Sequence, residues 1–219
     1  MPDLDIQIAG AEPVAYGVTP LLHFRLHIVN KAAAETIQAV LLHAQIQIES
    51  PRRAYNDREK EKLSDLFGTP ERWSQTLRNR LWTHANVMVR AFTGSTDCIL
   101  PVPCTYDLNL TATKYFHALE DGEVCLLFLF SGTVFYLGPD ERLQTQPISW
   151  DKECTYRLPV RLWREMMELH YPNSAWLYLQ RDSFERLYAY KRRHGLATWE
   201  KTIEQLLPVT EPIPKELPA

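Results

Sequence analysis

The chain has 219 residues, of which 45% are hydrophobic and 23% charged, and its formal net charge is −3. This composition is ordinary for a globular protein, the charge argues against a general nucleic-acid binder, which carries a basic excess, and the length suits one domain or two small ones. No apolar run reaches about 18 residues, so we expect no membrane span. The start, MPDLDIQIAG, lacks the basic segment of a secretory signal. We therefore expect a cytoplasmic protein whose cysteines stay as free thiols, namely Cys98, Cys104, Cys125 and Cys154.

The first 50 residues predict antiparallel strands. A short alternation begins at Leu4, and the segments 22–28 and 40–48 alternate apolar and polar residues with a period of two. Such a period is typical of strands with one buried face. Two strands joined by a short polar link predict a meander or a sandwich.

Residues 54–79 break this pattern and predict a helical insertion. Leu63, Leu66 and Phe67 recur at helical spacing, and Gly68 follows them as a helix C-cap would. Thr69 and Pro70 then suit the N-cap and first position of another helix. The apolar residues of the insertion need cover, which we expect at an open end of the sheet pair.

Strands are predicted again from residue 82 to 92, and from 104 to 110, where apolar and polar residues alternate. Residues 115–119 are interpreted as a continuation of that second strand after a bulge. Residues 100–103 are extended because each residue that precedes a proline avoids the helical region. Weaker strands are expected at 143–148 and 153–158.

The longest apolar run, Val124 to Leu137, is predicted to form the centre of the fold. Its residues are apolar without alternation, which indicates burial on both faces. We expect at least one of Leu127 and Leu129 to point into the core. Ser131-Gly132 divides the run into either two strands around a tight turn or one strand with a glycine bend. A turn at Gly138-Pro139-Asp140 follows.

After Pro159 the apolar period changes to that of a helix, which Pro172 ends. Residues 175–179 are interpreted as a short edge strand. Asp182 is predicted to cap a second helix, and Thr198 a third. The tail, 208–219, has four prolines and no periodicity, so we expect it to be mobile.

These elements predict an α+β fold: an antiparallel β-sandwich, immunoglobulin-like in general form, with a helical insertion and a C-terminal helical segment. We expect a single domain over 1–207, with the sandwich in 1–158, the insertion in 54–79 and the C-terminal helices in 160–207. About 60 residues make a marginal core alone, so the C-terminal helices are expected to belong to the same domain.

The sequence indicates no metal site. His23 and His27 are four residues apart on a strand, and at about 3.3 Å per residue this separation is too large for one ion. Cys98, Cys104 and Cys154 match no common zinc spacing, even with His84 nearby in the sequence.

No catalytic motif or cofactor motif is present either. Ser131-Gly132 lacks the G-x-S-x-G elbow, and the glycine patterns that bind phosphates are absent. We therefore expect no catalytic, cofactor-binding or metal residues, although sites can form from residues far apart in the chain.

A group of large side chains is a candidate interface, because aromatic residues and methionine are enriched at interfaces. Burial of the C-terminal helices against the sandwich would equally explain why large side chains occur at these positions, and we favour that alternative. The candidate interface residues are Trp163, Met166, Met167, Trp176 and Tyr178.

Three parts of the chain resemble a known family: KLSDLFGTPERW (62–73), the pair FTGSTDCILPVPCTYDLNL and DGEVCLLFLFSGTVF (92–110 and 121–135), and RLPVRLWREMMELHYPNSAWLYLQRDSFERLYAYKRRHG (157–195). Together they resemble an uncharacterised bacterial family, a domain of unknown function often encoded near nickel-iron hydrogenases. The resemblance covers nearly the whole chain. It implies a cytoplasmic accessory protein linked to hydrogenase maturation, and it transfers no catalytic residue.

The function expected from the sequence is a non-enzymatic protein-binding or assembly accessory module. We expect a protein partner, which the sequence does not identify, and we expect neither a nucleic acid nor a membrane as partner. The alternative is an enzyme or small-ligand binder with a pocket between the sandwich and the helices. Perturbed titratable groups in a pocket would favour the alternative, and an exposed apolar patch would favour the binding module.

Overall fold

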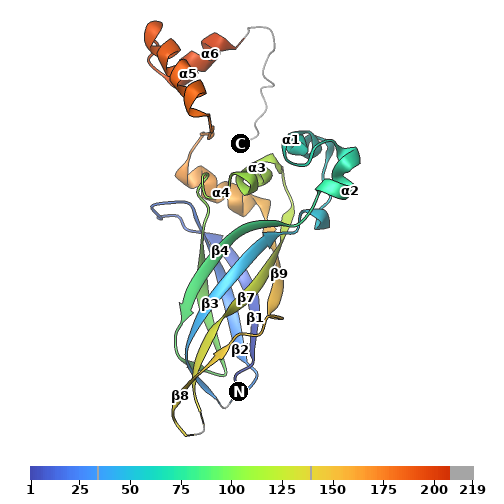
Figure 1. Ribbon diagram of the computed structural model, residues 1–219, viewed down its shortest axis with the longest axis vertical. Coiled ribbons are helices and arrows are strands. Elements are labelled where there is room, and N and C mark those ends of the chain that lie inside the picture. Colours follow the sequence, from blue (N-terminus) through green and yellow to red (C-terminus); the bar gives the residue numbers. More distant parts are fainter. Residues whose placement is uncertain (34, 139, 208–219) are drawn as a thin grey trace. The chain divides into compact units, whose positions relative to one another are not determined.

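The computed structural model of the chain describes residues 1–33, 35–138 and 140–207 (Figure 1). The chain divides into two compact units, Met1–Ser174 and Ala175–Ala219, and each is described by itself. The first unit holds every described strand together with helices α1 to α4. The second holds α5 (Arg181–Arg193) and α6 (Trp199–Leu206).

The first unit contains two antiparallel sheets. The smaller sheet has the strand order β1-β2-β6, and the larger has the order β4-β3-β7-β8, with β5 also paired to β3 and β9 to β7. The strands are β1 (Leu4–Pro13), β2 (Leu21–Asn30), β3 (Thr36–Ile48), β4 (Arg80–Val89), β5 (Phe92–Thr93), β6 (Ser95–Pro103), β7 (Glu123–Leu137), β8 (Leu143–Pro147) and β9 (Glu153–Pro159).

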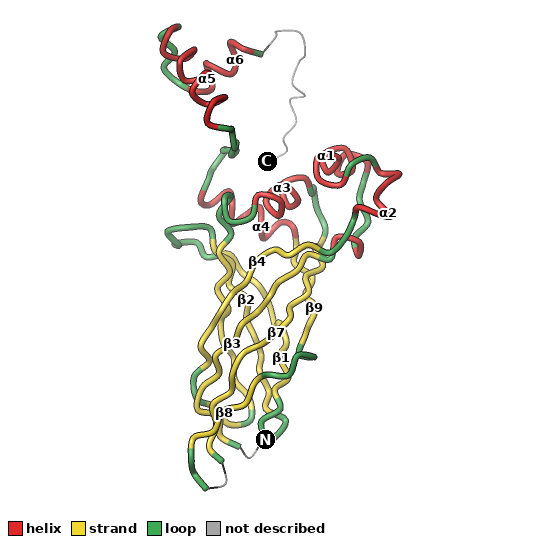
Figure 2. Tube along the Cα trace, viewed as in Figure 1, coloured by secondary structure: helices red, strands yellow, loops and turns green. Residues whose placement is uncertain are grey.

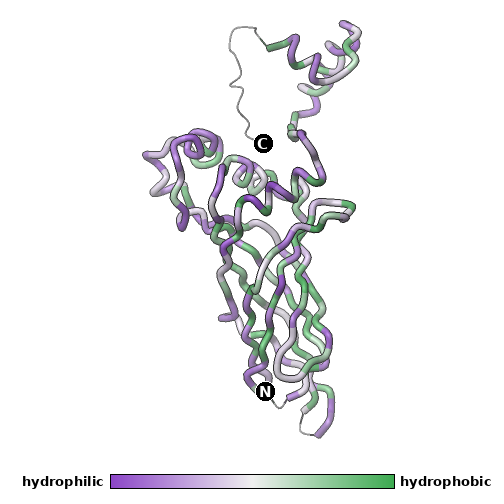
Figure 3. The backbone as a smooth tube through the Cα atoms, turned by 180° about the vertical axis from the view of Figure 1, so that it is seen from behind, coloured by the Kyte–Doolittle hydropathy of each residue, from purple (hydrophilic) through white to green (hydrophobic). Residues whose placement is uncertain are grey.

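The core lies between these sheets. Phe24 of β2 in the smaller sheet contacts Phe128 of β7 and Tyr156 of β9 in the larger sheet, with ring centroids 5.2 and 5.9 Å apart. Alternate residues of the strands, such as Leu22 and Leu42, are fully buried. Figure 3 shows hydrophobic residues along the strands of this unit. The predicted α+β class with two antiparallel sheets is confirmed.

The helical insertion at 54–79 is also confirmed. It contains α1 (Asp57–Phe67) and α2 (Trp73–Thr76), with a 3₁₀ turn before each, Ser50–Arg52 and Pro70–Arg72. Asn56 and Glu59 form a reciprocal capping box at the start of α1, and Gly68 is its C-cap. Figure 2 shows α1 to α4 beyond one end of the strands rather than over a sheet face.

The prediction of a strand at 104–110, with a continuation at 115–119, is wrong. This segment leads into a helix instead, α3 (Leu110–Ala118). The Oδ1 atom of Asn109 accepts a hydrogen bond from the Ala112 N–H (3.0 Å), and its amide nitrogen donates to the carbonyls of Leu81 and Trp82 (3.0 and 2.8 Å). Asn109 therefore starts the helix and also ties it to β4. The sequence pattern alone does not reveal this tertiary contact.

The central run forms one strand, β7, so the alternative of a glycine bend holds. Gly132, with φ of +139°, lies in this strand. The prediction of burial on both faces is wrong. Leu126 and Phe128 are buried, but Leu127 and Leu129 both point to the outer face, where they are half-buried. The helices of this unit lie at the strand ends, so they leave the outer face of β7 without a covering layer.

The helix predicted after Pro159 is confirmed as α4 (Val160–His170), whose buried residues include Trp163. In the second unit, 175–179 is not a strand. Gln180 rather than Asp182 occupies the N-cap of α5, so Asp182 lies inside the first turn, where its charge still suits the helix dipole. Thr198 caps α6 as predicted.

The single domain over 1–207 stays a prediction. The tail at 208–219 and Pro139 of the predicted turn lie outside the described residues.

Candidate functional site

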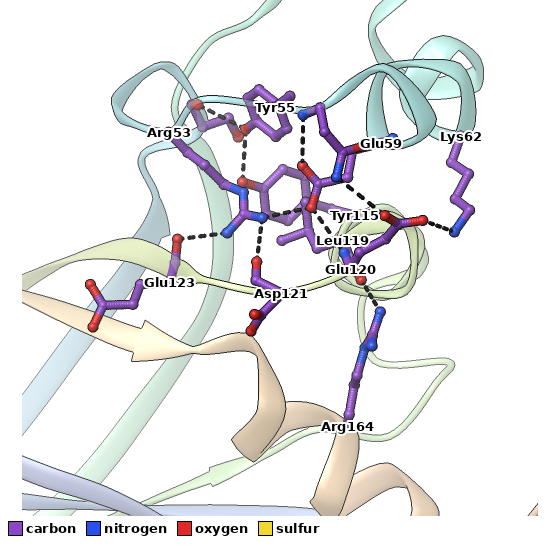
Figure 4. Close-up of polar contacts among 12 residues, drawn as sticks. Arg53, Tyr55, Glu59, Lys62, Tyr115, Leu119, Glu120, Asp121, Glu123 and Arg164 are labelled. Atoms are coloured by element: carbon purple, nitrogen blue, oxygen red, sulfur yellow. Dashed lines mark hydrogen bonds and ion pairs between the residues drawn. The ribbon is translucent and has the colours of Figure 1, made fainter. Parts of the chain in front are cut away.

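A buried ion pair joins the helical insertion to the end of the sandwich (Figure 4). Arg53 and Glu59 lie 2.6 Å apart, and their side chains are 10% and 3% exposed. The Arg53 guanidinium also donates hydrogen bonds to the backbone carbonyls of Glu123 (2.9 Å) and Asp121 (2.5 Å). Because one arginine binds both the insertion and the start of β7, this contact fixes the insertion in place.

The Glu59 carboxylate accepts three bonds in this network. It accepts hydrogen bonds from the backbone N–H groups of Asn56 (3.2 Å) and Glu120 (2.9 Å) in addition to the Arg53 ion pair. The Glu120 carboxylate in turn binds Lys62, and Arg164 of α4 donates to the Leu119 carbonyl. These bonds and the 3% exposure of the Glu59 side chain suit a structural role, because they hold the carboxylate in place and away from solvent.

The hydroxyl groups of two tyrosines lie next to this ion pair and contact each other. The Tyr55 hydroxyl donates to the Ser50 carbonyl (2.8 Å) and lies 2.8 Å from the hydroxyl of Tyr115. Burial raises the pKa of Tyr55 and of Tyr115 above the ordinary value for tyrosine. Both hydroxyls therefore stay protonated at neutral pH, so neither can serve as a base.

The thiols of the chain are all free, but their surroundings oppose reactivity. The Cys125 thiol donates to Glu49 (3.1 Å), which also binds Arg52 (2.7 Å), and burial together with this carboxylate raises the pKa of Cys125. Burial raises the pKa of Cys104 to about 12 and that of Cys98 and Cys154 to about 11. A nucleophilic thiol needs the opposite shift.

A row of three polar residues crosses the larger sheet. His43 of β3 stands opposite Ser131 of β7 and Asn86 of β4, and its Nδ1 atom lies 2.7 Å from the Asn86 Oδ1 atom. Nucleophilic sites use a base between a nucleophile and an orienting group. Here no hydrogen bond between Ser131 and His43 occurs in the described structure, and neither described cavity includes the row.

Two small cavities lie in the described part of the chain. One, of about 10 Å³, lies between the sandwich and the helices α3 and α4, where the sequence-based alternative placed a pocket; its lining includes Trp82, Asn109 and Trp163. The other, of about 40 Å³, is lined by residues that include Asp3, Gln146 and Lys152. Pockets for organic ligands measure about 300–1,000 Å³, so these two cavities are too small for such a ligand.

Within the described ranges, no cluster of three or more His, Cys, Asp or Glu side chains could hold a metal ion. The same ranges contain no helix with the length and apolar character needed to cross a bilayer.

The outer side of the larger sheet carries an apolar surface, here named the open face. Leu41 and Met88 stand directly opposite each other on β3 and β4 and are 42% and 65% exposed. Leu81 is also exposed, and Leu127 and Leu129 are half-buried on the same side. The open face consists of Leu41, Leu81, Met88, Leu127, Leu129 and Phe135.

Uncharged polar groups lie between these apolar side chains. Gln47 stands between Leu81 and Leu127 in one cross-strand row, and His43 occupies the neighbouring part of β3. Exposed charged residues of this side include Glu153 and Arg157 of β9 and Glu123 at the start of β7. A surface that mixes apolar side chains with uncharged polar groups and carries few charges is compatible with a protein interface.

The open face is not among the sites predicted from the sequence. The signal was present, since β7 is apolar in both of its alternating phases and Leu41, Leu81 and Met88 interrupt polar phases of their strands. This signal predicts burial on both faces, because a sequence does not say whether a sheet face is covered.

The five candidate interface residues lie in different environments. Trp163, Met166 and Met167 are buried in the core of the first unit, as the favoured alternative predicts. The Trp163 ring stacks on Phe116 of α3, with centroids 5.3 Å apart. In the second unit, Trp176 and Tyr178 are exposed and their rings stack at 6.1 Å. Of the five candidate residues, Trp176 and Tyr178 are therefore the two that a partner protein could contact at the surface.

Comparison with known proteins identifies a family without assigning an activity. A family model described as a family of unknown function (DUF6084) matches residues 1–214. No curated protein matches the chain.

Two solved structures show a remote likeness. One is a solution structure of a protein assigned as late embryogenesis abundant (LEA), at 14% identity and a TM-score of 0.30, covering 73% of this chain and 72% of the other. The second is a crystal structure of a protein assigned as ApaA from Bordetella pertussis, at 11% identity and a TM-score of 0.25, covering 72% of this chain and 95% of the other. Scores this low carry no argument about function.

Proposed function

We propose that the chain, which belongs to DUF6084, a family of unknown function, acts as a non-enzymatic accessory module that binds another protein through the open face. The observation that carries this proposal is that apolar side chains are exposed on the outer side of β7 and its neighbouring strands. Leu41 and Met88 are exposed there, and the helices of the first unit leave this side uncovered. Full burial of a fully exposed leucine or methionine contributes about 1.5–3 kcal/mol, and these partly exposed side chains would contribute a part of that before the costs of association.

The chemistry of the remaining groups supports binding over catalysis. The Glu59 carboxylate is buried and bonded within the chain, the thiols have raised pKa values, and the described cavities have no room for an organic substrate. The alternative of an enzyme or small-ligand binder between sandwich and helices has no observation of this kind in its favour.

In its finer form, the proposal is a cytoplasmic module that assists maturation of a nickel-iron hydrogenase. This part rests on the resemblance of residues 62–73, 92–110, 121–135 and 157–195 to the family whose genes lie near those of hydrogenases. It is separable from the open-face proposal, because a protein partner of any pathway could occupy that surface.

The test is affinity capture with an open-face variant. The double substitution Leu41→Glu and Met88→Glu places two charges on the open face, where a partner would have to desolvate them. Tagged wild-type and variant proteins are incubated with lysate of the source cells, and retained proteins are quantified by mass spectrometry. We expect the variant to lose the partner retained by the wild type, and hydrogenase maturation proteins to be among those lost.

The matched control is Leu169→Glu, at an exposed leucine of α4 that is not part of the open face. It should retain the partner, and all three proteins should melt at similar temperatures because the substituted side chains are exposed. Retention of the same proteins by all three would overturn the role of the open face. Loss of a partner without any hydrogenase protein among those captured would overturn only the finer form.

A further inference from the structure

The two helices of the second unit hold a cluster of aromatic rings, here named the aromatic face. It consists of Phe184 and Tyr188 of α5 and Trp199 of α6, whose ring centroids lie 5.5–6.1 Å apart. Phe184 and Tyr188 are 46% and 47% exposed, and α5 has no buried residue. A helix pair this small cannot enclose three aromatic rings, so an apolar surface stays open to a partner.

Cations lie directly against these rings. The Nζ atom of Lys191 is 5.6 Å from the centroid of the Trp199 ring, and the guanidinium carbon of Arg192 is 6.0 Å from that of Tyr188. Lys191 also donates to the carbonyls of Leu196 and Ala197 (2.8 and 3.0 Å), which fixes its position at the turn between the helices.

These cations are not neutralised by the chain's own acids in the described ranges. Each of the ion pairs found there joins groups between Met1 and Arg157, and none includes Lys191 or Arg192. A partner with carboxylates would therefore meet unpaired positive charge beside an exposed apolar surface, the arrangement that electrostatic complementarity requires.

We propose that the aromatic face binds an acidic amphipathic helical segment of a partner protein. Apolar side chains spaced three and four residues apart would lie on the rings of Phe184 and Tyr188. Carboxylates on the flank of that segment would pair with Arg192, whose planar guanidinium can bind them in bidentate fashion. Aromatic residues and arginine are also the types that dominate binding energy at interfaces.

Charge distribution favours this occupant over a nucleic acid or an anionic membrane. Asp182 and Glu185 lie in α5, and Glu200 and Glu204 lie in α6, among the cations of the same helices. These acids would repel a surface of uniform negative charge, whereas a peptide can place its carboxylates at selected positions only. The inference goes beyond the open-face proposal because it concerns other residues and names the chemistry of the partner.

The experiment measures binding of a labelled peptide to the full-length protein by fluorescence anisotropy. The probe is a synthetic amphipathic helix with leucine and phenylalanine on one side and glutamate on the other. A second peptide has lysine in place of each glutamate, and a third is a scrambled form of the first. We expect the acidic helix to bind at least about tenfold more tightly than either control, which corresponds to about 1.4 kcal/mol, and to weaken as salt is added.

Two variants locate the contact. Arg192→Glu reverses the charge, and Phe184→Ala removes a ring; each should weaken binding of the acidic helix by about tenfold or more. The control Arg142→Glu reverses a well-exposed charge outside the second unit and should leave binding unchanged. The open-face double variant should also bind the acidic helix normally, so failure of one proposal can be told from failure of the other.

Three results would overturn the inference. The first is equal binding of the acidic and scrambled peptides, and the second is normal binding by Arg192→Glu. The third is a fall in the melting temperature of the whole protein on Phe184→Ala by more than a few degrees, since that loss would mean that the ring is covered within the chain. Binding to vesicles of anionic phospholipid that exceeds binding to the peptide, and that Phe184→Ala abolishes, would assign the aromatic face to a membrane instead.

Discussion

Gly132 allows β3 and β7 to approach each other in the middle of the larger sheet. Its φ is +139°, and a Cβ atom added there would lie 1.9 Å from the carbonyl oxygen of Leu41. A residue with a side chain would be strained at this φ, and its Cβ atom would clash with β3 unless the two central strands moved apart. Ser131-Gly132 was the one point in the apolar run where the sequence indicated a special backbone, because glycine inside a strand marks a bend or a close approach.

We therefore expect Gly132→Ala to destabilise the protein by about 3 kcal/mol or more, the range of backbone strain combined with a steric clash. Gly94→Ala is the matched control, because Gly94 also has a positive φ (+74°) but no atom lies within 4 Å of the added Cβ. That variant should lose only about 1–2 kcal/mol. Urea denaturation of both variants measures the difference, and equal losses would mean that the clash is relieved by a shift of β3.

The Arg53–Glu59 pair is a buried ion pair among the polar contacts that hold the insertion, which also include Tyr55–Tyr115 and Lys62–Glu120. Breaking a buried pair from one side leaves an unpaired charge, which costs about 3–5 kcal/mol. Glu59→Ala should show a loss of this size in denaturant unfolding. Lys60→Ala, which breaks the neighbouring surface pair with Asp57, should leave stability essentially unchanged. If the two variants are equally stable, the hydrogen bonds to the carbonyls of Asp121 and Glu123 are sufficient to stabilise the buried Arg53 charge without Glu59.

This pair was not predictable from sequence. Arg53 and Glu59 lie in a polar stretch that indicates only a solvated helix, and the carbonyls that complete the site come from residues about 70 positions later. Asn109 is a similar case. Its capping of α3 could be anticipated from residue type, but its bonds to β4 carbonyls need the tertiary structure, and the local alternation of 104–110 favours a strand.

At the scale of elements, β7 determines both the core and the proposed binding surface. The residues of one phase, including Leu126 and Phe128, fill the space between the sheets, while Leu127 and Leu129 of the other phase lie on the open face. Sequence predicts the strand because apolar residues are continuous, but the same continuity would result from a second covering layer or from a binding surface. Only the placement of the helices at the strand ends separates these alternatives.

The two phases should respond differently to truncation. Leu126→Ala is expected to cost about 2–5 kcal/mol, the range for a fully buried leucine. Leu127→Ala should cost clearly less, because its side chain is half-buried and leaves no closed cavity. Chemical denaturation of both variants measures the difference. A loss at Leu127 as large as that at Leu126 would mean that the outer side of β7 is covered, and the open face would then not be available to a partner.

At the scale of the whole molecule, the described core lies entirely in the first unit. Its buried residues run from Leu4 to Met167, and α4 supplies four of them, among which Trp163 stacks on Phe116. The sequence-based boundary of the sandwich at residue 158 therefore separates α4 from the core that it completes. The change of period after Pro159 correctly predicted a helix, but a periodicity cannot tell whether that helix ends one unit or begins the next.

Two truncations test this organisation. A fragment of residues 1–158 loses the buried face of α4, so it should melt far below the full chain or fail to fold, since each large core side chain removed costs about 2–5 kcal/mol. A fragment of 1–174 keeps every described core residue and should unfold in one cooperative transition followed by circular dichroism. If 1–158 melts as high as 1–174, then α4 adds nothing to the core, and the packing of Trp163 on Phe116 is not stabilising.

The 1–174 fragment also decides whether 1–207 is a single domain. Helices that belong to one domain share its core, so their removal lowers the melting temperature by about 4–8 °C for each kcal/mol lost in a small domain, and somewhat less in a chain of this length. The single-domain prediction therefore requires 1–174 to melt measurably below the full chain, and the full chain to unfold in one transition. Equal melting temperatures would mean that α5 and α6 are an appendage, free to carry the aromatic face to a partner independently of the sandwich.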